Sequence, residues 1–333
     1  MQKWMKKFAA LLAGLSLAGT TLPSVAAQTS DDNKVDLILD WVPNTNHTGL
    51  YVAQAKGYFK EVGVEVDIKR PPEGSTTELV GLGKAAFGIA FQDSLAKRFA
   101  GGLPVTAVAA IIEHNTSGII AKEEAGIKDP KGLEGHKYGT WNDPIELKMM
   151  EYMTKKAGGD FSKASLVPND GDNSIIGLAN NQFDAAWVYY AWDGILAGFQ
   201  KVSTTFFQIR DIAPELDFYS PVIIANNDYL KAHPDQAKKV LAAIKKGYQY
   251  AMEHPEEAAD ILIEAAPELK DQRDFVLASQ KWLSERYASD PAKWGQFDPA
   301  RWNAFYQWLY DNKLVESDLT KGQYFSNEYL GAE

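Results

Sequence analysis

Residues 36–59 read DLILDWVPNTNHTGLYVAQAKGYF. Apolar residues 37–39 predict a short strand, and a helix should begin at Thr48 and end at Gly57. The loop between them carries an indole, two amides and an imidazole, on Trp41, Asn44, Asn46 and His47. In an open α/β sheet, ligands bind at the loops that follow the carboxyl ends of the strands. We therefore expect this loop to hold a flat, polar, uncharged molecule, because an aromatic face can stack on it while amide and imidazole groups hydrogen-bond its edge.

The bulk composition limits the class of protein. A chain of 333 residues, 45% of them hydrophobic, can form one large domain or two of ordinary size. Its mean hydropathy of −0.29 fits a soluble protein. The net charge of −10 argues against nucleic acid or an anionic membrane surface as a partner, because both repel an acidic chain. Since the chain has no cysteine, disulfides, thiolate metal sites and a cysteine nucleophile are excluded.

The first 27 residues have the pattern of an export signal. A lysine-rich start is followed by the apolar run 8–18, and VAA at 25–27 precedes the expected cleavage before Gln28. The apolar run is too short to span a membrane, and no later stretch approaches the roughly 20 apolar residues that a membrane helix needs. Because no cysteine can be acylated, we expect the exported protein to have no lipid anchor.

Short strands alternate with short helices in the first part of the chain. Val64, Val66 and Ile68 alternate with polar residues, as in a half-buried strand. Residues 87–91 and 105–112 are continuous apolar runs, which are expected of strands covered on both faces. The expected helices cover residues 77–82 and the segment from Ser94 to the glycines at 101 and 102. This alternation predicts an α/β fold.

A weak internal repeat predicts two lobes. LVGL at 79–82 recurs as IIGL at 175–178, and Phe87 recurs as Phe183 at the same offset. Each copy is a helix that leads into an apolar strand, so each lobe would place a strand end at a shared cleft. Polar groups follow both strands, as Gln92-Asp93 and as Tyr189-Tyr190-Ala191-Trp192-Asp193. We expect hinges near residues 115–118 and 216–220.

The rest of the chain contains one more strand and many helices. A short strand at 137–141 is followed by Asp143-Pro144-Ile145-Glu146, a capping-box-like helix start. That helix should run to about residue 157. From Pro234 onward the periodicity is helical, with interruptions at Pro255, Pro267 and Pro291.

Several candidate site residues also have purely structural interpretations. His47 could bond backbone at a helix end, and its position in the strand-to-helix loop makes a ligand role equally plausible. Trp187 and Tyr189 alternate along a strand, so part of this aromatic group should pack in the core. Asp193 could cap a helix at 194–199 or accept hydrogen bonds from an amino-substituted heterocycle. For Asp93 we favour the capping role, with Ser94 opening the helix.

The evidence for an enzyme is weak. The five histidines show no metal-ligand spacing, which argues against a zinc site. The sequence has neither a Gly-x-Ser-x-Gly nucleophile motif nor a phosphate-binding Gly-x-x-x-x-Gly-Lys loop. Gly81-Leu82-Gly83-Lys84 is better interpreted as a helix end. We therefore expect no catalytic residues, no metal and no cofactor.

The chain resembles periplasmic solute-binding proteins of ABC importers, and is most similar to the branch that binds formylaminopyrimidine, a thiamin precursor. The resemblance covers nearly all of residues 35–333. Its most specific parts are DWVPNTNHTGLY at 40–51, the stretch 78–92, HNTSG at 114–118 and YYAWDGI at 189–195.

This resemblance implies a two-lobed α/β fold, the type II periplasmic binding protein. Lobe one would comprise residues 35–116 plus 219–333, and lobe two residues 117–218. The lobes would close around a small aminopyrimidine and present it to a permease in the inner membrane. We expect a periplasmic monomer. In the family a pyrimidine lies between aromatic rings and an acidic residue meets its amino group.

Carried over to this chain, the family pattern gives Trp41 and Tyr189 as the rings and Asp193, where relatives often have Glu, as the acceptor. The neighbouring strand-end residues complete the expected ligand-binding set: Asn44, His47, Gln92 and Trp192.

Two alternatives remain within the same fold. A yeast pyrimidine synthase of thiamin biosynthesis uses a lysine and a histidine four residues apart, where this chain has Ala90 and Ser94. Its cysteine-rich run is replaced by DFYSP at 217–221. Nitrate, sulfonate and taurine binders need basic or helix-amide anion sites, which the segments 41–47 and 189–193 do not offer.

Overall fold

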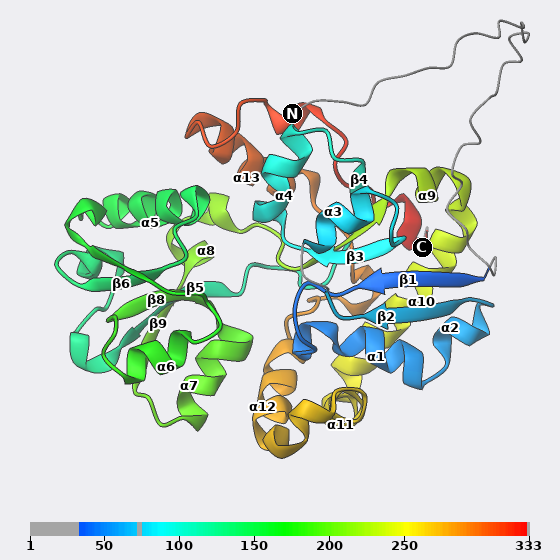
Figure 1. Cartoon of the computed structure of the whole chain (residues 1–333), viewed down its shortest axis with the longest axis horizontal. Helices are drawn as coiled ribbons and strands as arrows, with labels where there is room; N and C mark the ends of the chain where they lie inside the picture. The colour runs from blue at the N-terminus through cyan, green and yellow to red at the C-terminus, as the bar shows by residue number, and fades with distance from the viewer. Residues whose placement is uncertain (1–32, 72–74, 332–333) are drawn as a thin grey trace, which may run out of the picture.

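The computed structural model describes residues 33–71 and 75–331, so the expected export signal at 1–27 lies outside the described part. Two five-stranded sheets lie side by side (Figure 1). The first sheet has the order β2-β1-β3-β10-β4 and the second the order β7-β6-β8-β5-β9. The strands of the first sheet are β1 (Lys34–Ile38), β2 (Glu65–Lys69), β3 (Phe87–Ala90), β4 (Val105–Ala110) and β10 (Val222–Asn226). Those of the second are β5 (Ser117–Lys122), β6 (Lys137–Thr140), β7 (Ser165–Pro168), β8 (Ala185–Tyr189) and β9 (Thr204–Gln208).

The two sheets have the same topology. In the first, β1 pairs in parallel with β2 and β3, and β10 runs antiparallel to β3 and β4. In the second, β6 pairs in parallel with β7 and β8, and β5 runs antiparallel to β8 and β9. Helix α3 (Thr76–Gly81) leads into β3 as α6 (Ser174–Ala179) leads into β8. The repeat predicted from residues 79–82 and 175–178 is therefore confirmed, and with it the two-lobed α/β fold.

The chain crosses between the sheets twice, at 111–116 between β4 and β5 and at 209–221 between β9 and β10. We call the part built on the first sheet lobe one and the part built on the second lobe two. The strand order shows only that each lobe boundary lies within one of these segments. The predicted lobe boundaries at 116/117 and 218/219 therefore stay a proposal. The second crossing contains α8 (Ile209–Ile212).

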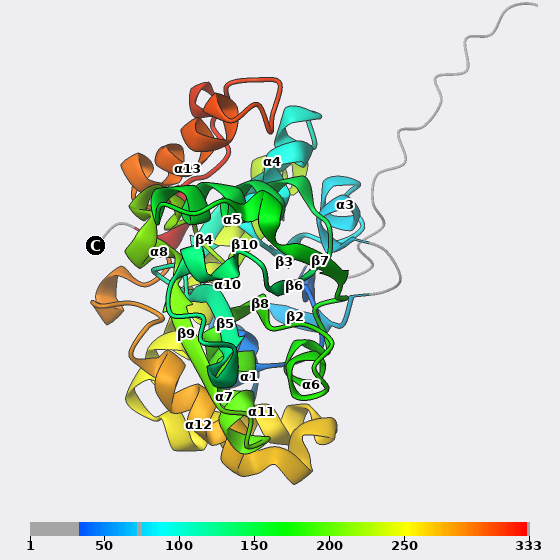
Figure 2. The same ribbon diagram turned by 90° about the vertical axis from the view of Figure 1, so that its left-hand side faces the viewer.

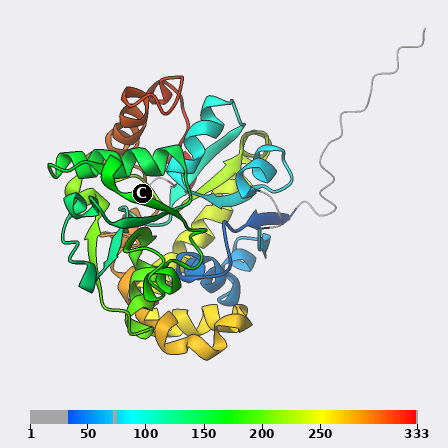
Figure 3. The ribbon, with the colours of Figure 1, turned by 60° about the vertical axis from the view of Figure 1, so that its left-hand side comes forward.

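Helices cover the faces of both sheets (Figures 1 and 3). Those before the second crossing are α1 (Thr48–Ala55), α2 (Tyr58–Glu61), α4 (Gln92–Ala100), α5 (Pro144–Lys156) and α7 (Ile195–Phe199). Those after it are α9 (Asn227–Ala232), α10 (Pro234–Glu253), α11 (Pro255–Ala265), α12 (Arg273–Ser284) and α13 (Pro299–Asp311). Proline is the first residue of α10 and α11, as expected from Pro234 and Pro255, because its missing N–H would have no helical partner there.

Helix α1, which follows the candidate loop, is held tightly against α10. A Cβ built on Gly247 of α10 would lie 2.0 Å from the carbonyl oxygen of Gly49, so only glycine permits this approach. The chain then leaves α1 through Gly57, whose φ of +77° lies in the left-handed region that favours glycine. The helix predicted from Thr48 to Gly57 is confirmed. Its close contact with α10 fixes the position of the loop that precedes it.

The predicted caps had mixed outcomes. The capping box at the start of α5 is confirmed: the Asp143 carboxylate accepts from the backbone N–H of Ile145 at 2.7 Å, and the Glu146 carboxylate accepts from that of Asp143 at 3.4 Å. The capping role for Asp93 is wrong, because α4 begins two residues earlier than expected and Phe91 is its N-cap residue. Asp193 is likewise no helix cap. It lies inside a π-helical turn, Tyr190–Gly194, that runs directly into α7.

Two of the contacts between the lobes outside the crossings involve helices α12 and α13; Figure 2 views the molecule from the side of the second sheet. In one, the ring of Phe275 on α12 lies 4.6 Å from Trp192 in the π turn of lobe two. In the other, the rings of Tyr152 on α5 and Trp308 on α13 have centroids 5.4 Å apart. Aromatic contacts of this kind bury apolar area from both lobes, and they fix how the carboxyl ends of the two sheets face each other.

Candidate functional site

Asn44 shapes the loop after β1. Its side-chain oxygen accepts from the backbone N–H of Asn46 at 2.8 Å, and its amide nitrogen donates to the carbonyl oxygen of Val42 at 3.0 Å. The residue is 4% exposed. Both polar ends of Asn44 are thus occupied within the loop, where they maintain the short 3₁₀ turn Thr45–His47.

His47 is fully buried beneath the same loop. Its Nδ1 accepts from the backbone N–H of Asn44 at 3.2 Å, so in the neutral ring the proton sits on Nε2. Nε2 lies 2.7 Å from Oδ1 of Asp40 and donates to it. The imidazole therefore orients the carboxylate of Asp40, a residue that the sequence analysis did not single out.

A row of aromatic rings leads from lobe two into lobe one. Trp141, just after β6, lies 5.0 Å from Trp187, which lies 6.3 Å from Tyr189. The Tyr189 ring stacks on Phe91 of lobe one at 5.8 Å, with 29° between the planes. Tyr189 ends β8 and Phe91 follows β3, so this contact joins the carboxyl ends of the central strands of the two sheets.

Two indoles near the strand ends are solvent-accessible. Trp41 is 36% exposed and forms no contact with another aromatic ring within residues 33–71 and 75–331. Trp141 is 41% exposed although one face packs on Trp187. Trp192, in contrast, packs edge-on against Phe275 and contributes to the contact between the lobes.

The charges of two carboxylates, Asp93 and Asp40, act on the Tyr189 hydroxyl. Burial raises the pKa of Tyr189 well above its usual value, and the nearby charges of Asp93 and Asp40 raise it further. Ser220 of the second crossing donates to this hydroxyl at 2.9 Å. The structure thus gathers Tyr189, Asp40 and Asp93 in one place, although only Tyr189 was expected there.

Asp193 lies in the π turn beside this group. Burial raises the pKa of Asp193 to about 7, and the charge of Asp172 adds to the effect, while backbone N–H groups partly oppose it. The carboxyl group forms no ion pair within 4.0 Å among the described residues. It is therefore partly protonated near neutral pH and can share a proton with a ligand.

The Gln92 side chain is used inside the protein. Its amide nitrogen donates to the carbonyl oxygen of Trp302 at 3.0 Å, and its oxygen accepts from the backbone N–H of Tyr219 at 2.8 Å. Gln92 thereby ties the end of β3 to α13 and to the second crossing. Its expected contact with a ligand stays a prediction.

Sequence reasoning missed Asp40, Phe91 and Trp141, and it named Trp187 only as one of the aromatic residues of its strand. For Phe91 and Trp141 a usable signal was present, because each directly follows a predicted strand and the carboxyl-end rule applies to every parallel strand of a sheet. Asp40 and Trp187 could not be assigned in this way, since their roles depend on His47 beneath the loop and on Trp141 in the neighbouring strand.

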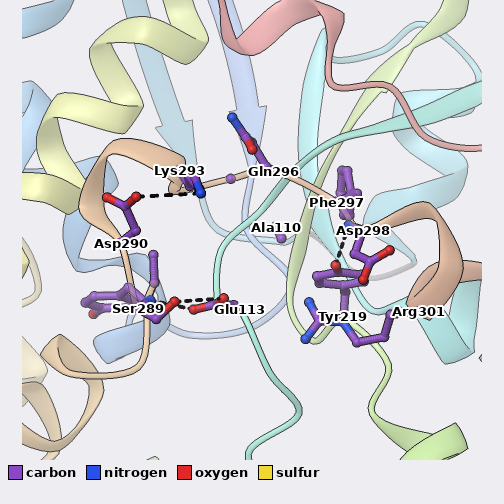
Figure 4. A pocket seen from close by; sticks show the side chains of 13 residues that line it. Ala110, Glu113, Tyr219, Ser289, Asp290, Lys293, Gln296, Phe297, Asp298 and Arg301 are labelled. Atoms are coloured by element: carbon purple, nitrogen blue, oxygen red, sulfur yellow. Dashed lines mark hydrogen bonds and ion pairs between the residues drawn. The ribbon is translucent and has the colours of Figure 1, made fainter. Parts of the chain in front are cut away.

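A pocket of about 230 Å³ lies elsewhere, against both crossings (Figure 4). Its charged groups are engaged with neighbours. Glu113 accepts from the Ser289 hydroxyl at 3.0 Å, and Arg301 lies over the Tyr219 ring with Asp217 3.3 Å from its guanidinium. Lys293 approaches Asp290 at 3.9 Å. Arg301 Nε is buried there without a hydrogen-bond partner, but the charges of these groups are paired, so we place the candidate site at the strand ends instead.

Residues 33–71 and 75–331 contain no group of three or more His, Cys, Asp or Glu side chains that could hold a metal ion. None of their helices combines the length and the apolar character needed to cross a membrane.

Comparisons with known proteins agree with this architecture. The chain is 26% identical to the formylaminopyrimidine-binding protein of Halalkalibacterium halodurans, over 97% of this chain and 99% of that protein. It is 30% identical to the 4-amino-5-hydroxymethyl-2-methylpyrimidine phosphate synthase THI11 of Saccharomyces cerevisiae, over 73% of this chain and 74% of the synthase. Among solved structures, the alkanesulfonate-binding protein SsuA of Xanthomonas axonopodis pv. citri has a TM-score of 0.67 at 12% identity, with 88% of this chain and 98% of SsuA covered.

The fold is thus that of periplasmic binding proteins. Residues 44–258, more than half of the chain, match the family model described as NMT1/THI5 like. This match begins at Asn44, within the loop after β1, and includes both crossings and all of the second sheet. The chain belongs to the NMT1/THI5-like family.

Proposed function

We propose that this protein is the extracytoplasmic solute-binding component of an ABC importer, and that it binds a thiamin-precursor aminopyrimidine of the formylaminopyrimidine or hydroxymethylpyrimidine type. The main support is the contact between Tyr189 and Phe91, which carries an aromatic surface from one lobe to the other at the carboxyl ends of both sheets. A planar heterocycle that lies between this aromatic surface and a second ring gains stacking energy, and water is displaced from both of its faces.

The ring edge would be recognised by Asp193. A carboxyl group whose pKa is raised to about 7 can donate its proton to a ring nitrogen while its second oxygen accepts from the adjacent amino group. Trp41 would cover the second face of the ring, since its indole is exposed and free of other ring contacts in the described part of the chain. Asn44 and His47 would act indirectly, by holding the loop and Asp40 in place.

The comparisons support a carrier. The relative that matches almost the whole chain is named a binding protein, and SsuA, which shares the fold, is named one too. We propose a periplasmic monomer, exported through residues 1–27, that delivers its ligand to an inner-membrane permease. It would close its lobes on the ligand as it does so.

A synthase is the second candidate, because several relatives over about three quarters of the chain carry that name. The local chemistry argues against it. Ala90 is a buried apolar residue, and the Ser94 hydroxyl is engaged with the carbonyl oxygen of Phe91 at 3.0 Å. Neither supplies the lysine amine or the imidazole that the resemblance assigns to the synthase at these positions.

One experiment separates the candidates. The purified protein is titrated by calorimetry with aminopyrimidines, with an alkanesulfonate and with nitrate, and the recovered ligand is analysed by mass spectrometry. A carrier of the proposed kind binds an aminopyrimidine, returns it chemically unchanged and shows a smaller radius of gyration in X-ray scattering when it is bound. Binding of the anions alone, or turnover that a Tyr189→Ala substitution abolishes, would refute the proposal.

A further inference from the structure

Asp93, at the turn from β3 into α4, has one carboxylate oxygen without a hydrogen-bond partner. It sits in the first turn of α4, two residues after Phe91, and its Oδ1 is buried without a hydrogen-bond partner. Burial raises the pKa of Asp93 to about 6, the backbone N–H groups of Ser94 and Asp93 partly oppose this, and the charge of Asp143 in lobe two adds to it. Among the described residues Asp93 forms no ion pair within 4.0 Å, because Arg98 on the same helix is engaged with Glu78 at 2.9 Å.

Of the parallel strands, all except β2 are followed by acidic segments. The segments that follow β1, β3, β6, β7 and β8 are residues 40–47, 91–94, 141–143, 169–173 and 189–194, and none contains lysine or arginine. They do contain six aspartates: Asp40, Asp93, Asp143, Asp170, Asp172 and Asp193. A site with this charge repels anions and attracts cations.

The basic groups close to these segments are already paired. Lys97 lies 3.4 Å from Asp143, and His47 lies 2.7 Å from Asp40. At the end of β2, Lys69 lies 2.6 Å from Asp36, and Arg70 pairs with Glu268. Among the described residues, Asp93 and Asp193 are left without a cation within 4.0 Å. An unpaired buried carboxylate destabilises the free protein, so a bound group that donates to it should bind strongly.

We propose that Asp93 is a second ligand-binding carboxylate, and that the preferred ligand is an aminopyrimidine that also bears a protonated aliphatic amine. This inference rests on the proposed aminopyrimidine binding and narrows its ligand class. The sequence analysis favoured an uncharged molecule on the basis of the loop 41–47 alone. The assembled site adds a carboxylate that a neutral hydroxymethyl or formamide group satisfies only in part, whereas an ammonium group both donates hydrogen bonds and neutralises the charge.

The test uses a matched series in which one aminopyrimidine ring carries an aminomethyl, a hydroxymethyl or a formylaminomethyl group. Calorimetry at neutral pH should show the amine bound roughly ten-fold or more tightly than the two neutral compounds, with an advantage that shrinks as salt is added. Asp93→Asn, which keeps the size of the side chain, should remove that advantage and leave the affinity for the neutral compounds within about two-fold. Asp228→Asn, at a side chain that is 87% exposed, should change neither affinity.

The outcomes separate this inference from the function on which it rests. Equal affinity of the wild-type protein for all three compounds would overturn the role of Asp93 and leave aminopyrimidine binding intact. An equal loss of affinity for all three compounds in Asp93→Asn would also overturn the role of Asp93 in the preference for the amine. Failure of all three to bind to the wild-type protein would overturn both. Because the wild-type series alone decides the charge preference, the test does not depend on how well the Asp93→Asn variant folds.

Discussion

The Ser279 hydroxyl on α12 of lobe one donates a 2.5 Å hydrogen bond to the carbonyl oxygen of Ala191 in the π turn of lobe two. The same Ser279 oxygen lies 2.6 Å from the Thr45 hydroxyl in the loop after β1, which must then be the donor. Ser279 is fully buried. One serine thus connects the candidate ligand loop with the turn that carries Asp193.

Replacement of Ser279 by alanine should affect both stability and binding. It leaves the Ala191 carbonyl and the Thr45 hydroxyl without their partner, which should cost about 1–3 kcal/mol of unfolding free energy. Ligand affinity should also fall, because the contact spans the two lobes. Ser284→Ala is the matched control: this buried serine of α12 donates to Ala251 at 2.9 Å, within lobe one. It should lower the thermal midpoint and leave the affinity unchanged. Equal effects of both variants on affinity would contradict the link between lobes.

Removal of the Trp41 indole should weaken binding without loss of stability. Trp41→Leu exchanges an exposed stacking surface for a smaller one, and aromatic stacking on a heterocyclic base contributes about 1–3 kcal/mol. Calorimetry with the bound aminopyrimidine measures the loss. Tyr310→Leu, at another exposed aromatic residue that is 41% accessible, should bind like the wild-type protein. A Trp41→Leu variant with unchanged affinity would remove Trp41 from the site.

Loss of the Asp193 carboxyl group should leave a ligand amino group and ring nitrogen without their partner. Asp193→Ala should therefore cost about 1–3 kcal/mol of binding free energy. Since Asp193 caps no helix, the thermal midpoint should not fall. Asp172→Ala, at the exposed neighbour whose charge affects Asp193, is the control and should retain most of the affinity. A lower midpoint with unchanged affinity would assign Asp193 a structural role.

Asp193 should also make the stability depend on pH. Burial raises the pKa of its carboxyl group from 3.8 to about 7 in the folded protein, so between these values the folded state binds more protons than the unfolded state. The unfolding free energy contributed by this group therefore falls as the pH rises from about 4 to 7. The unfolding free energy of Asp193→Asn should equal that of the wild-type protein at pH 4.5. At pH 8 it should be higher, by about 2 kcal/mol after solvent screening is allowed for. Parallel pH profiles of the two proteins would refute the raised pKa.

The export signal can be tested directly. N-terminal sequencing of protein from the periplasmic or culture fraction should give a chain that begins at Gln28. The lysine-rich start, the apolar run 8–18 and the VAA sequence at 25–27 motivate this expectation. An intact Met1, or protein confined to the cytoplasm, would contradict it and strengthen the case for an enzyme.

The sequence by itself determined the secondary-structure elements and the number of lobes. Hydrophobic periodicity, glycine stops and proline starts are local signals, so the helix at 48–57, the capping box at Asp143 and the repeated helix-strand unit could all be predicted from short windows. The carboxyl-end rule then located Trp41, Tyr189 and Asp193 at strand ends. Helix starts were less certain, since Asp93 and Asp193 have typical capping side chains although the helices begin before them.

Only the tertiary structure decided which side chains remain available to a ligand. Asn44 and Gln92 have the amide chemistry of a binding residue, and both side chains also form hydrogen bonds within the protein, so their contact with a ligand stays a prediction. Asp93 precedes Ser94 as a capping residue would, but its Oδ1 is buried without a hydrogen-bond partner. The charges near it are those of Asp143 and of Arg98, which pairs with Glu78. Whether a polar atom is free depends on partners far away in the chain, and a local pattern contains no information about those partners.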